Sequence, residues 1–338
     1  MNAMAGARRP TVRDIADHLD VSTSTVSRAL NGSRLANEAT RALIIETAEA
    51  MGYEKRVTRR HGKRRILIVA LFLPHSNVPY RHLFYDPAEL IAGIEAGFTD
   101  VKVHVVTSID EQEPEILGHK KLGDIDGVVF GFTTPNRRLS RQLEAQGIPA
   151  VLLNRVSQEL NYVSCDNQAG MRTLLAKAMA CRNSLRPCHI SYSPAEPVAR
   201  YRELAFLEAC SSYELPVGAE DVFRVESLEE IDRSLIQTIR ERGYNAVICF
   251  NDFVAVYFYQ VALAHHIEIP EEISLSGFDN SPVRELTPQK IDTIDLSPFD
   301  LGREAGLWLK DVIINRESGG LQKMITGEFI PGETLCRS

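Results

Sequence analysis

Four polar side chains in one short segment have the chemistry to recognise another molecule. Thr23, Ser24, Ser27 and Arg28 lie within six positions of one another. Small hydroxyls can bond to nucleic-acid base edges or phosphates, and an arginine can bond guanine through two parallel N–H donors. These groups can act together only if one rigid element presents them, so the surrounding sequence must form that element.

Two short helices separated by a turn are predicted around these residues. Thr11 can cap the first helix, and Asp14 three positions later completes a capping box. Ser22 can cap a second helix that runs to about Leu30, and Asn31 with the following glycine supplies a stop signal. The first helix carries apolar residues at helical spacing, namely Val12, Ile15, Ala16 and Leu19. Ordinary bundle helices can show the same pattern, so the pattern alone leaves DNA binding and simple packing open.

A third helix is predicted within residues 37–53. Asn37 can cap it and Gly52 can end it. One side should be packed inward, with Leu43, Ile44, Thr47, Ala48 and Met51. Together the three helices form a small all-α unit whose second helix carries the exposed polar groups.

Charge is distributed unevenly along the chain. Residues 1–65 contain 13 Lys and Arg against 7 Asp and Glu, a net charge of +6, whereas residues 66–338 contain 25 against 38, a net charge of −13. A basic N-terminal unit on an acidic protein is drawn to phosphates while the body is not. The charge therefore favours a nucleic-acid partner for the N-terminal unit.

The N-terminal sequence resembles the headpiece of the lactose/galactose repressor family of bacterial transcription regulators. The resemblance is carried by VRDIADHLDVSTSTVSRALNG and by NEATRALIIETAEAMGY. It implies that Thr23 and Ser24 occupy the positions of the base-reading pair and Arg28 that of the groove-facing arginine. It also implies phosphate or capping contacts from Ser22, Thr25, Ser27 and Asn31.

The linker at residues 55–65 departs from that family. Seven of its eleven residues are Lys or Arg, and His61 falls near the position where the family places a leucine that wedges into the minor groove. We therefore expect electrostatic contact with the DNA backbone, strong salt dependence and no hinge wedge. Arg56 and Arg59, together with Thr11, complete the expected DNA-binding residues.

Apolar runs and amphipathic stretches alternate from residue 66 onward. The runs lie at 66–73, 101–107, 125–131, 150–153, 189–192, 246–250 and 273–278. The helical stretches lie at 88–98, 138–146, 167–180, 199–210, 228–240 and 254–265. This alternation predicts parallel sheets flanked by helices, in a body long enough for two lobes. The family resemblance implies a two-lobed α/β body of the periplasmic-binding-protein type, with a ligand in the cleft.

The expected division of the chain follows from these patterns. It comprises a disordered lead at 1–9, a helix-turn-helix DNA-binding domain at 10–54, the basic linker at 55–65, and an effector-binding and dimerisation domain at 66–338. Within the last, lobe 1 is expected at about 66–163 and 294–323, and lobe 2 at about 164–291 and 324–338.

Polar residues at predicted strand ends are candidates for contact with an effector. Asn251 and Asp279 each follow an apolar run, where open α/β sheets bind ligands, and by the resemblance Arg202 stands where the family reaches its effector. Carboxylate, amide and guanidinium groups suit a polyol. The other candidates are Asn154, Cys165, Phe250 and Tyr85.

Several of these positions have simpler interpretations. Asp252 and Asp166 can each cap the helix that follows, and Arg202 with Asp279 can form a structural ion pair. The segment 76–87 differs from the family, and its Arg81 and His82 either grip an anionic ligand or belong to a surface loop.

The sequence contains no signature of an enzyme or a cofactor. No glycine-rich phosphate loop, nucleophile elbow or metal-ligand spacing is present, so no catalytic residue, metal or cofactor is expected. We expect the six cysteines to be reduced thiols, and the chain to be cytoplasmic with no membrane association. The cysteines are Cys165, Cys181, Cys188, Cys210, Cys249 and Cys336.

These patterns together predict a sequence-specific transcription regulator. We expect a homodimer, or a tetramer, that binds a pseudo-palindromic DNA operator and represses genes of carbohydrate use under the control of a small sugar-like effector. The alternative is a regulator of the same family that responds to a protein partner or has no effector.

Overall fold

The computed structural model describes residues 12–30, 38–51, 66–74, 86–108, 124–316 and 319–336. The chain divides into two compact units, Met1–His61 and Gly62–Ser338. Within the described ranges no helix has both the length and the apolar character needed to cross a membrane.

The first unit contains three helices, α1 (Val12–Leu19), α2 (Thr23–Leu30) and α3 (Glu38–Ala50). Their inner faces bury a small core of Ile15, Ala16, Val26, Ala29, Ile44 and Ala48. The Ser22 hydroxyl accepts a hydrogen bond from the Thr25 amide at 3.1 Å and so caps α2. The predicted helix-turn-helix and its serine cap are therefore confirmed.

One core residue of this unit was predicted wrongly. Leu43 was expected to face inward, but its side chain is 52% exposed, whereas the adjacent Ile44 is buried. Successive residues of a helix point about 100° apart, so the apolar run at 43–45 cannot all face the same core. The predicted caps Thr11 and Asn37 lie outside the described residues.

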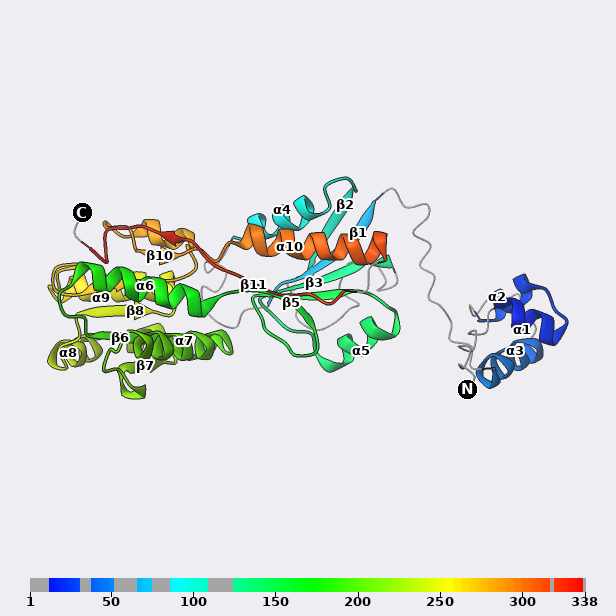
Figure 1. Ribbon diagram of the computed structural model, residues 1–338, viewed down its shortest axis with the longest axis horizontal. Coiled ribbons are helices and arrows are strands. Elements are labelled where there is room, and N and C mark those ends of the chain that lie inside the picture. The colour runs from blue at the N-terminus through cyan, green and yellow to red at the C-terminus, as the bar shows by residue number, and fades with distance from the viewer. Residues whose placement is uncertain are drawn as a thin grey trace, which may run out of the picture. The chain divides into compact units, whose positions relative to one another are not determined.

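A six-stranded parallel sheet forms one lobe of the second unit, in the order β11-β5-β4-β3-β1-β2. Its strands are β1 (Leu67–Phe72), β2 (Val103–Ser108), β3 (Gly127–Gly131), β4 (Ala150–Leu153), β5 (Asn161–Cys165) and β11 (Gln322–Ile325). Helices α4 (Pro87–Gly97) and α10 (Pro298–Lys310) lie side by side on one face, and α5 (Arg137–Ala145) covers the other (Figure 1). Because both faces are covered, β1 is almost wholly apolar and buried.

The other lobe contains a four-stranded parallel sheet in the order β7-β6-β8-β9. Its strands are β6 (Pro187–Tyr192), β7 (Val222–Val225), β8 (Ala246–Cys249) and β9 (Ser274–Ser276), and its helices are α6 (Asn167–Cys181), α7 (Val198–Ser212), α8 (Arg233–Glu241) and α9 (Asp252–Ala264). Strands β10 (Thr293–Ile294) and β12 (Phe329–Ile330) pair antiparallel. Short helical turns lie at Ser193–Ala195, Ala219–Asp221, Leu228–Glu230, Pro282–Leu286 and Asp311–Asn315. The predicted fold class is confirmed.

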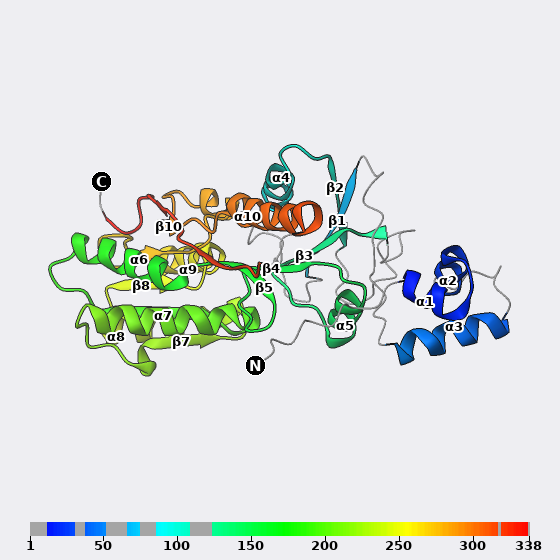
Figure 2. The same cartoon turned by 45° about the vertical axis from the view of Figure 1, so that its right-hand side comes forward.

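In each sheet the strand order reverses beside the strand that comes first along the chain. Strand β1 lies between β2 and β3, and β6 lies between β7 and β8. The chain passes from one lobe to the other after β5, after β10 and after β11 (Figure 2). In open α/β sheets ligands bind beyond the carboxyl ends of strands at such reversals, which directs attention to the residues that follow these strands.

The cysteines differ from the prediction at one pair. Cys165, Cys188, Cys210 and Cys249 are buried and unbridged, but Cys181 and Cys336 form a disulfide with Cα atoms 5.4 Å apart. Ser274 brings these two segments together, because its hydroxyl donates to the carbonyl of Leu335 at 2.7 Å and accepts from Arg182 at 2.8 Å. The prediction of six reduced thiols is wrong for this pair.

A buried histidine on β6 makes the stability of this lobe sensitive to acid. The His189 ring stacks on Phe206, its Nδ1 donates to the Ile248 carbonyl at 2.8 Å, and burial lowers its pKa from 6.5 to about 4. The unfolded chain therefore takes up a proton near pH 6.5 that the folded chain does not. The contribution of the buried neutral His189 ring to the free energy of unfolding is therefore complete above pH 6.5 and is lost as the pH falls toward 4.

We expect His189→Gln to remove this part of the acid sensitivity. A pKa depressed by this much corresponds to roughly 3 kcal/mol of unfolding free energy between pH 6.5 and 4. Urea denaturation of both proteins across that range measures the difference. Parallel pH profiles would show that His189 is not the responsible group.

Candidate functional site

The predicted DNA-reading helix is formed, but only part of its surface is described. Thr23 is exposed at the start of α2, and the hydroxyls of Ser22 and Thr25 lie 2.8 Å apart in the cap. The backbone positions of Ser24, Ser27 and Arg28 lie on α2, while their side chains are outside the described set. Thr11, Asn31, Arg56 and Arg59 are also outside it. The DNA-binding residues thus stay predictions.

In the body, the structure brings together Arg202 from α7 and Asp279 from the segment after β9. Nη2 of Arg202 lies 2.5 Å from Oδ1 of Asp279, and Nη1 lies 3.3 Å from Oδ2. Only 1% of Arg202 and 8% of Asp279 is exposed. The pair is bidentate and nearly dry, as the structural-ion-pair interpretation predicts, and it lies at the strand end where the effector site was also predicted.

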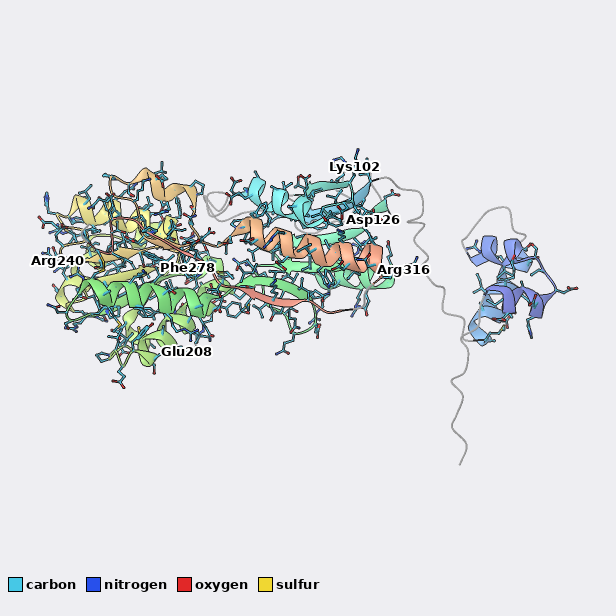
Figure 3. The ribbon with its side chains drawn as sticks, turned by 45° about the horizontal axis from the view of Figure 1, so that its top comes forward. Lys102, Asp126, Glu208, Arg240, Phe278 and Arg316 are labelled. Carbon is cyan, nitrogen blue, oxygen red and sulfur yellow. A yellow bond between two sulfur atoms is a disulfide. The ribbon has the colours of Figure 1, made fainter. Side chains whose placement is uncertain are left out.

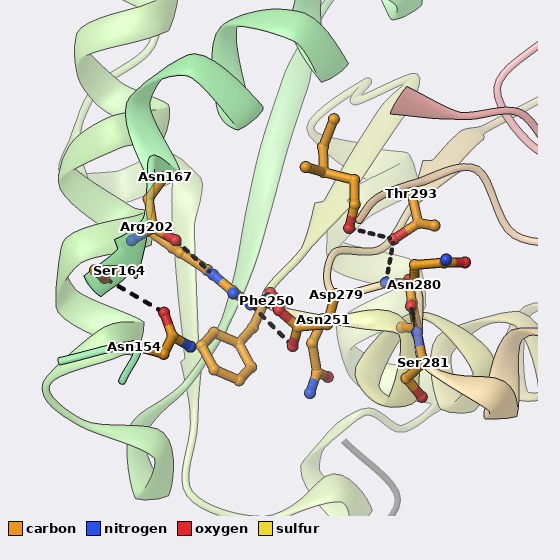
Figure 4. Close-up of polar contacts among 12 residues, drawn as sticks. Asn154, Ser164, Asn167, Arg202, Phe250, Asn251, Asp279, Asn280, Ser281 and Thr293 are labelled. Carbon is orange, nitrogen blue, oxygen red and sulfur yellow. Dashed lines mark hydrogen bonds and ion pairs between the residues drawn. The ribbon is translucent and has the colours of Figure 1, made fainter. Parts of the chain in front are cut away.

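Arg202 has further partners that hold its guanidinium in place. Its Nε donates to Oδ1 of Asn167 at 3.1 Å, and Nη1 donates to the Phe250 carbonyl at 2.7 Å (Figure 4). The guanidinium also lies 4.8 Å from the ring centre of Phe250 and 4.0 Å from that of Phe278, which Figure 3 labels. Two aromatic rings, a carboxylate and an amide therefore fix this cation at the carboxyl ends of the strands.

Asn251 caps the helix that follows β8. Its Oδ1 accepts a hydrogen bond from the Val254 amide at 3.0 Å, which satisfies the first turn of α9. The expectation that Asp252 caps this helix is wrong, because Asp252 is the first helical residue and its Oδ2 accepts from the Ser281 amide at 2.6 Å. Burial raises the pKa of Asp252 well above its ordinary value. The predicted cap of α6 by Asp166 is confirmed.

Among the described residues, the Asn251 amide group Nδ2 is buried without a hydrogen-bond partner. An unmade hydrogen bond in a buried site costs about 1–3 kcal/mol, so proteins seldom leave one without a reason. A ligand that brings an acceptor to this position would remove that cost.

Backbone strain accumulates at the same strand ends. Phe132 after β3, Asn154 after β4, and Asp279 with Asn280 after β9 have φ angles of 59°, 52°, 98° and 53°. Residues other than glycine seldom adopt these angles, which cost on the order of 1–3 kcal/mol each. Such strain persists at sites where the position of a side chain matters for binding, and here it follows three strands of two different sheets.

The other predicted effector residues are placed as follows. Asn154 is buried and its Oδ1 accepts from the Ser164 hydroxyl at 3.5 Å, and the ring of Phe250 lies against Arg202. Cys165 lies in the core, where burial raises the pKa of its thiol to about 12, so no thiolate is available to a ligand. Tyr85 lies outside the described residues.

Two residues at this site were not predicted from the sequence. Asn167 holds Arg202 from the first turn of α6, and Phe278 stacks on the guanidinium. Phe278 directly precedes Asp279, so its closeness to the predicted site was a usable signal. Asn167 follows the helix cap Asp166, and nothing in its local sequence distinguishes it from a second capping residue.

The described residues also line a cavity away from this site. It has a volume of about 710 Å³ and involves Arg182, Pro187 and Tyr244, which lie at the amino ends of the strands. None of the predicted effector residues lines it. The described part of the chain contains no group of three or more side chains suited to hold a metal ion.

Comparison with known proteins gives a separate family match for each of the two parts of the chain. Residues 11–55 match the family described as bacterial regulatory proteins, lacI family, and residues 182–335 match a periplasmic binding protein-like domain. The HTH-type transcriptional regulator CelR of Thermobifida fusca is 28% identical, over 92% of this chain and 94% of its own length.

Solved structures show the same fold. A transcriptional regulator CelR–cellobiose complex superposes with a TM-score of 0.65 at 22% identity, covering 96% of this chain and 100% of that one. The lac repressor dimer bound to operator and the anti-inducer ONPF gives a TM-score of 0.63 at 16% identity, covering 97% and 100%.

A helix-turn-helix unit joined to a two-lobed α/β body is the architecture of a class of DNA-binding transcription regulators. The chain combines a helix-turn-helix domain of the lacI family of bacterial regulatory proteins with a periplasmic binding protein-like domain, and the proteins it resembles are regulators of that family. Its relatives are regulators rather than enzymes, in agreement with the expectation from the sequence.

Asn251 offers a test of local stability at this site. We expect Asn251→Ala to lower the unfolding free energy by about 1 kcal/mol through loss of the α9 cap. Asn251→Ser keeps an oxygen acceptor for the Val254 amide without adding a buried charge and should cost less, because serine caps helices about as well as asparagine. Urea denaturation compares the two, and equal losses would mean that the cap is not the source of the effect.

Proposed function

We propose that this chain is a dimeric repressor of carbohydrate-use genes that acts in the cytoplasm. In this proposal residues 10–54 bind a pseudo-palindromic operator, the basic linker 55–65 contacts the DNA backbone, and 66–338 binds the effector and dimerises. A dimer must present its two recognition helices about one DNA turn apart. A ligand that favours one arrangement of the lobes alters that spacing, so ligand and operator change each other's affinity by the same factor.

The observation that carries the effector proposal is the convergence of Arg202, Asn251 and Asp279 beside an aromatic ring at the strand ends. Carboxylate and amide groups next to a ring face suit the hydroxyls and the apolar side of a sugar. One similar structure is a complex of the transcriptional regulator CelR with cellobiose, which supports a sugar-like ligand.

The operator-binding proposal is tested at Arg28. Selection from a random DNA library with the purified chain should enrich a palindromic sequence. Arg28→Ala should then weaken binding to that sequence by roughly 1–3 kcal/mol, as expected for loss of a base-reading arginine. Fluorescence anisotropy at fixed salt measures this, and binding to unrelated DNA serves as the control. Equal affinities of the variant and the parent for the selected site would remove Arg28 from the base-reading set.

The effector proposal is tested by thermal shift against a panel of sugars. A ligand at 100 times its Kd stabilises the folded protein by about 2.7 kcal/mol, a readable rise in melting temperature. Operator binding should change in the presence of any ligand that gives this shift. A panel without a shift would favour regulation by a protein partner, or a repressor without an effector.

A further inference from the structure

Two of the six cysteines lie where a dissolved thiol can reach them. Cys181 is half-buried at the end of α6, Cys336 is exposed in the segment after β12, and the two are bonded to each other. The other four are at most 1% exposed, namely Cys165, Cys188, Cys210 and Cys249. Burial raises the pKa of Cys165 and of Cys210 to about 12, so these buried thiols are inert at neutral pH.

The fold holds the segment that carries Cys336 independently of the disulfide. Oδ2 of Asp292 accepts hydrogen bonds from the amides of Thr334 and Leu335, both at 2.8 Å, and Oδ1 accepts from the Gly332 amide at 2.9 Å. Asp292, Thr334 and Leu335 are all buried. The residues directly before Cys336 therefore have a fixed position even when the sulfur atoms are not joined.

The same network positions the residue next to Cys181. Nε of Arg182 donates to the Ser274 hydroxyl at 2.8 Å, and that hydroxyl donates to the Leu335 carbonyl at 2.7 Å. One hydroxyl thus connects the chain neighbours of both cysteines, whose Cα atoms lie 5.4 Å apart, within the range that a disulfide requires. The two thiols stay close together after reduction, so the bond can form again within one folded chain.

An accessible disulfide between elements that the fold already holds differs from a permanent structural bond. Exposed disulfides exchange with dissolved thiols more readily than the structural disulfides of secreted proteins do. In a reducing compartment, disulfides are mostly transient, catalytic or redox-sensing. The proposed function sets this chain in such a compartment, and the inference rests on it in this respect.

We propose that Cys181 and Cys336 are a reversible redox pair, which low-molecular-weight thiols and disulfides such as glutathione reduce and oxidise while the lobe stays folded. The bond joins the end of α6 to the end of the segment that returns from β11 to this lobe (Figure 1). Its two cysteines are 155 residues apart in the sequence, so the crosslink strongly restricts the unfolded chain. The oxidised protein is therefore more resistant to unfolding than the reduced protein.

Oxidation by glutathione disulfide proceeds in two exchange steps. The thiolate of Cys336, the more exposed of the two, attacks one sulfur of glutathione disulfide, which forms a mixed disulfide and releases one glutathione. The thiolate of Cys181 then attacks the Cys336 sulfur, which forms the internal disulfide and releases the second glutathione. Two electrons pass from the cysteines to glutathione disulfide, and the two protons that the cysteines lose are taken up by the released glutathione thiolates.

A glutathione titration of the full-length protein without denaturant tests the proposal. As the proportion of reduced glutathione rises, the number of thiols that react with a maleimide–polyethylene glycol reagent should increase from none to two per chain, and the change should reverse on reoxidation. The melting temperature should fall by roughly 4 °C or more on reduction. A pair that stays bonded in a large excess of reduced glutathione, or stays reduced in a large excess of glutathione disulfide, overturns the inference. The titration uses neither DNA nor effector, so such a failure leaves the regulator function standing.

Serine variants assign the effect to this pair. The double variant Cys181→Ser with Cys336→Ser should melt at the same temperature in both glutathione buffers, close to the reduced parent. Cys181→Ser alone lacks the second thiol, so intact-mass measurement should show one glutathione accumulating on Cys336. A melting shift that persists in the double variant, or no adduct on Cys336 in the single variant, would contradict the proposed exchange.

Discussion

Replacing Asp279 with alanine should lower the free energy of unfolding by about 3–5 kcal/mol, the cost of leaving one partner of a buried ion pair alone. Arg202 cannot turn toward solvent, because Asn167, the Phe250 carbonyl and two aromatic rings fix its guanidinium. The variant therefore keeps a buried charge without a counter-charge.

Urea denaturation of matched variants tests this expectation. An exposed pair, Lys290 and Glu285, lies 2.9 Å apart with more than half of each side chain exposed, so Glu285→Ala should change stability little. The double variant Arg202→Met with Asp279→Leu should regain much of the stability that Asp279→Ala loses, because apolar side chains of similar size carry no desolvation cost. A loss at Asp279 no larger than at Glu285 would contradict the buried-charge argument.

The strands and helices of the body were largely predictable because their sequence pattern is strong. Apolar runs such as 66–73 form strands buried on both faces, and the predicted helix 167–180 matches α6, which runs to Cys181. The predicted helix 228–240 is interrupted, since Asp232 caps a new helix, α8, after a short turn. In that segment a helix cap starts a new helix, although apolar residues recur at helical spacing throughout.

Short strands and residue pairings could not be predicted in the same way. Strand β11 has exposed side chains at Gln322, Lys323 and Met324, so its sequence lacks the alternation of apolar and polar residues that marks a strand. This strand forms because it pairs with β5. The partnership of Arg202 with Asp279 joins residues 77 positions apart, and that of Cys181 with Cys336 joins residues 155 apart. Contacts of this kind depend on the assembled topology.

The helix α10 was not predicted, and its glycines explain why. Gly302 and Gly306 lower the intrinsic tendency of this segment to form a helix. In the folded protein they lie against the α4 backbone at Leu90 and Ile94, so the two helices approach more closely than side chains would allow. The packing of α4 on α10 therefore stabilises a helix that the local sequence disfavours.

This close approach leads to a second large expected effect, at Gly93 of α4. A methyl group there would overlap the Phe299 carbonyl and lie 3.0 Å from the Arg303 amide, both of which belong to the backbone of α10. Backbone atoms cannot rotate away as a side chain can, so the helices must separate. We expect Gly93→Ala to destabilise the protein by about 2–3 kcal/mol. The gain in helix propensity, about 1 kcal/mol, is too small to offset this.

The matched control is Gly319→Ala. Among the described residues, and apart from its chain neighbours, no atom lies within 4 Å of the position that its methyl group would take, so the same chemical change should leave stability nearly unchanged. Denaturation midpoints of both variants in urea separate the overlap from the general effect of replacing glycine. If Gly93→Ala were as stable as Gly319→Ala, the helices would have room to separate at little cost, and the close packing of α4 on α10 would not be what holds α10 in place.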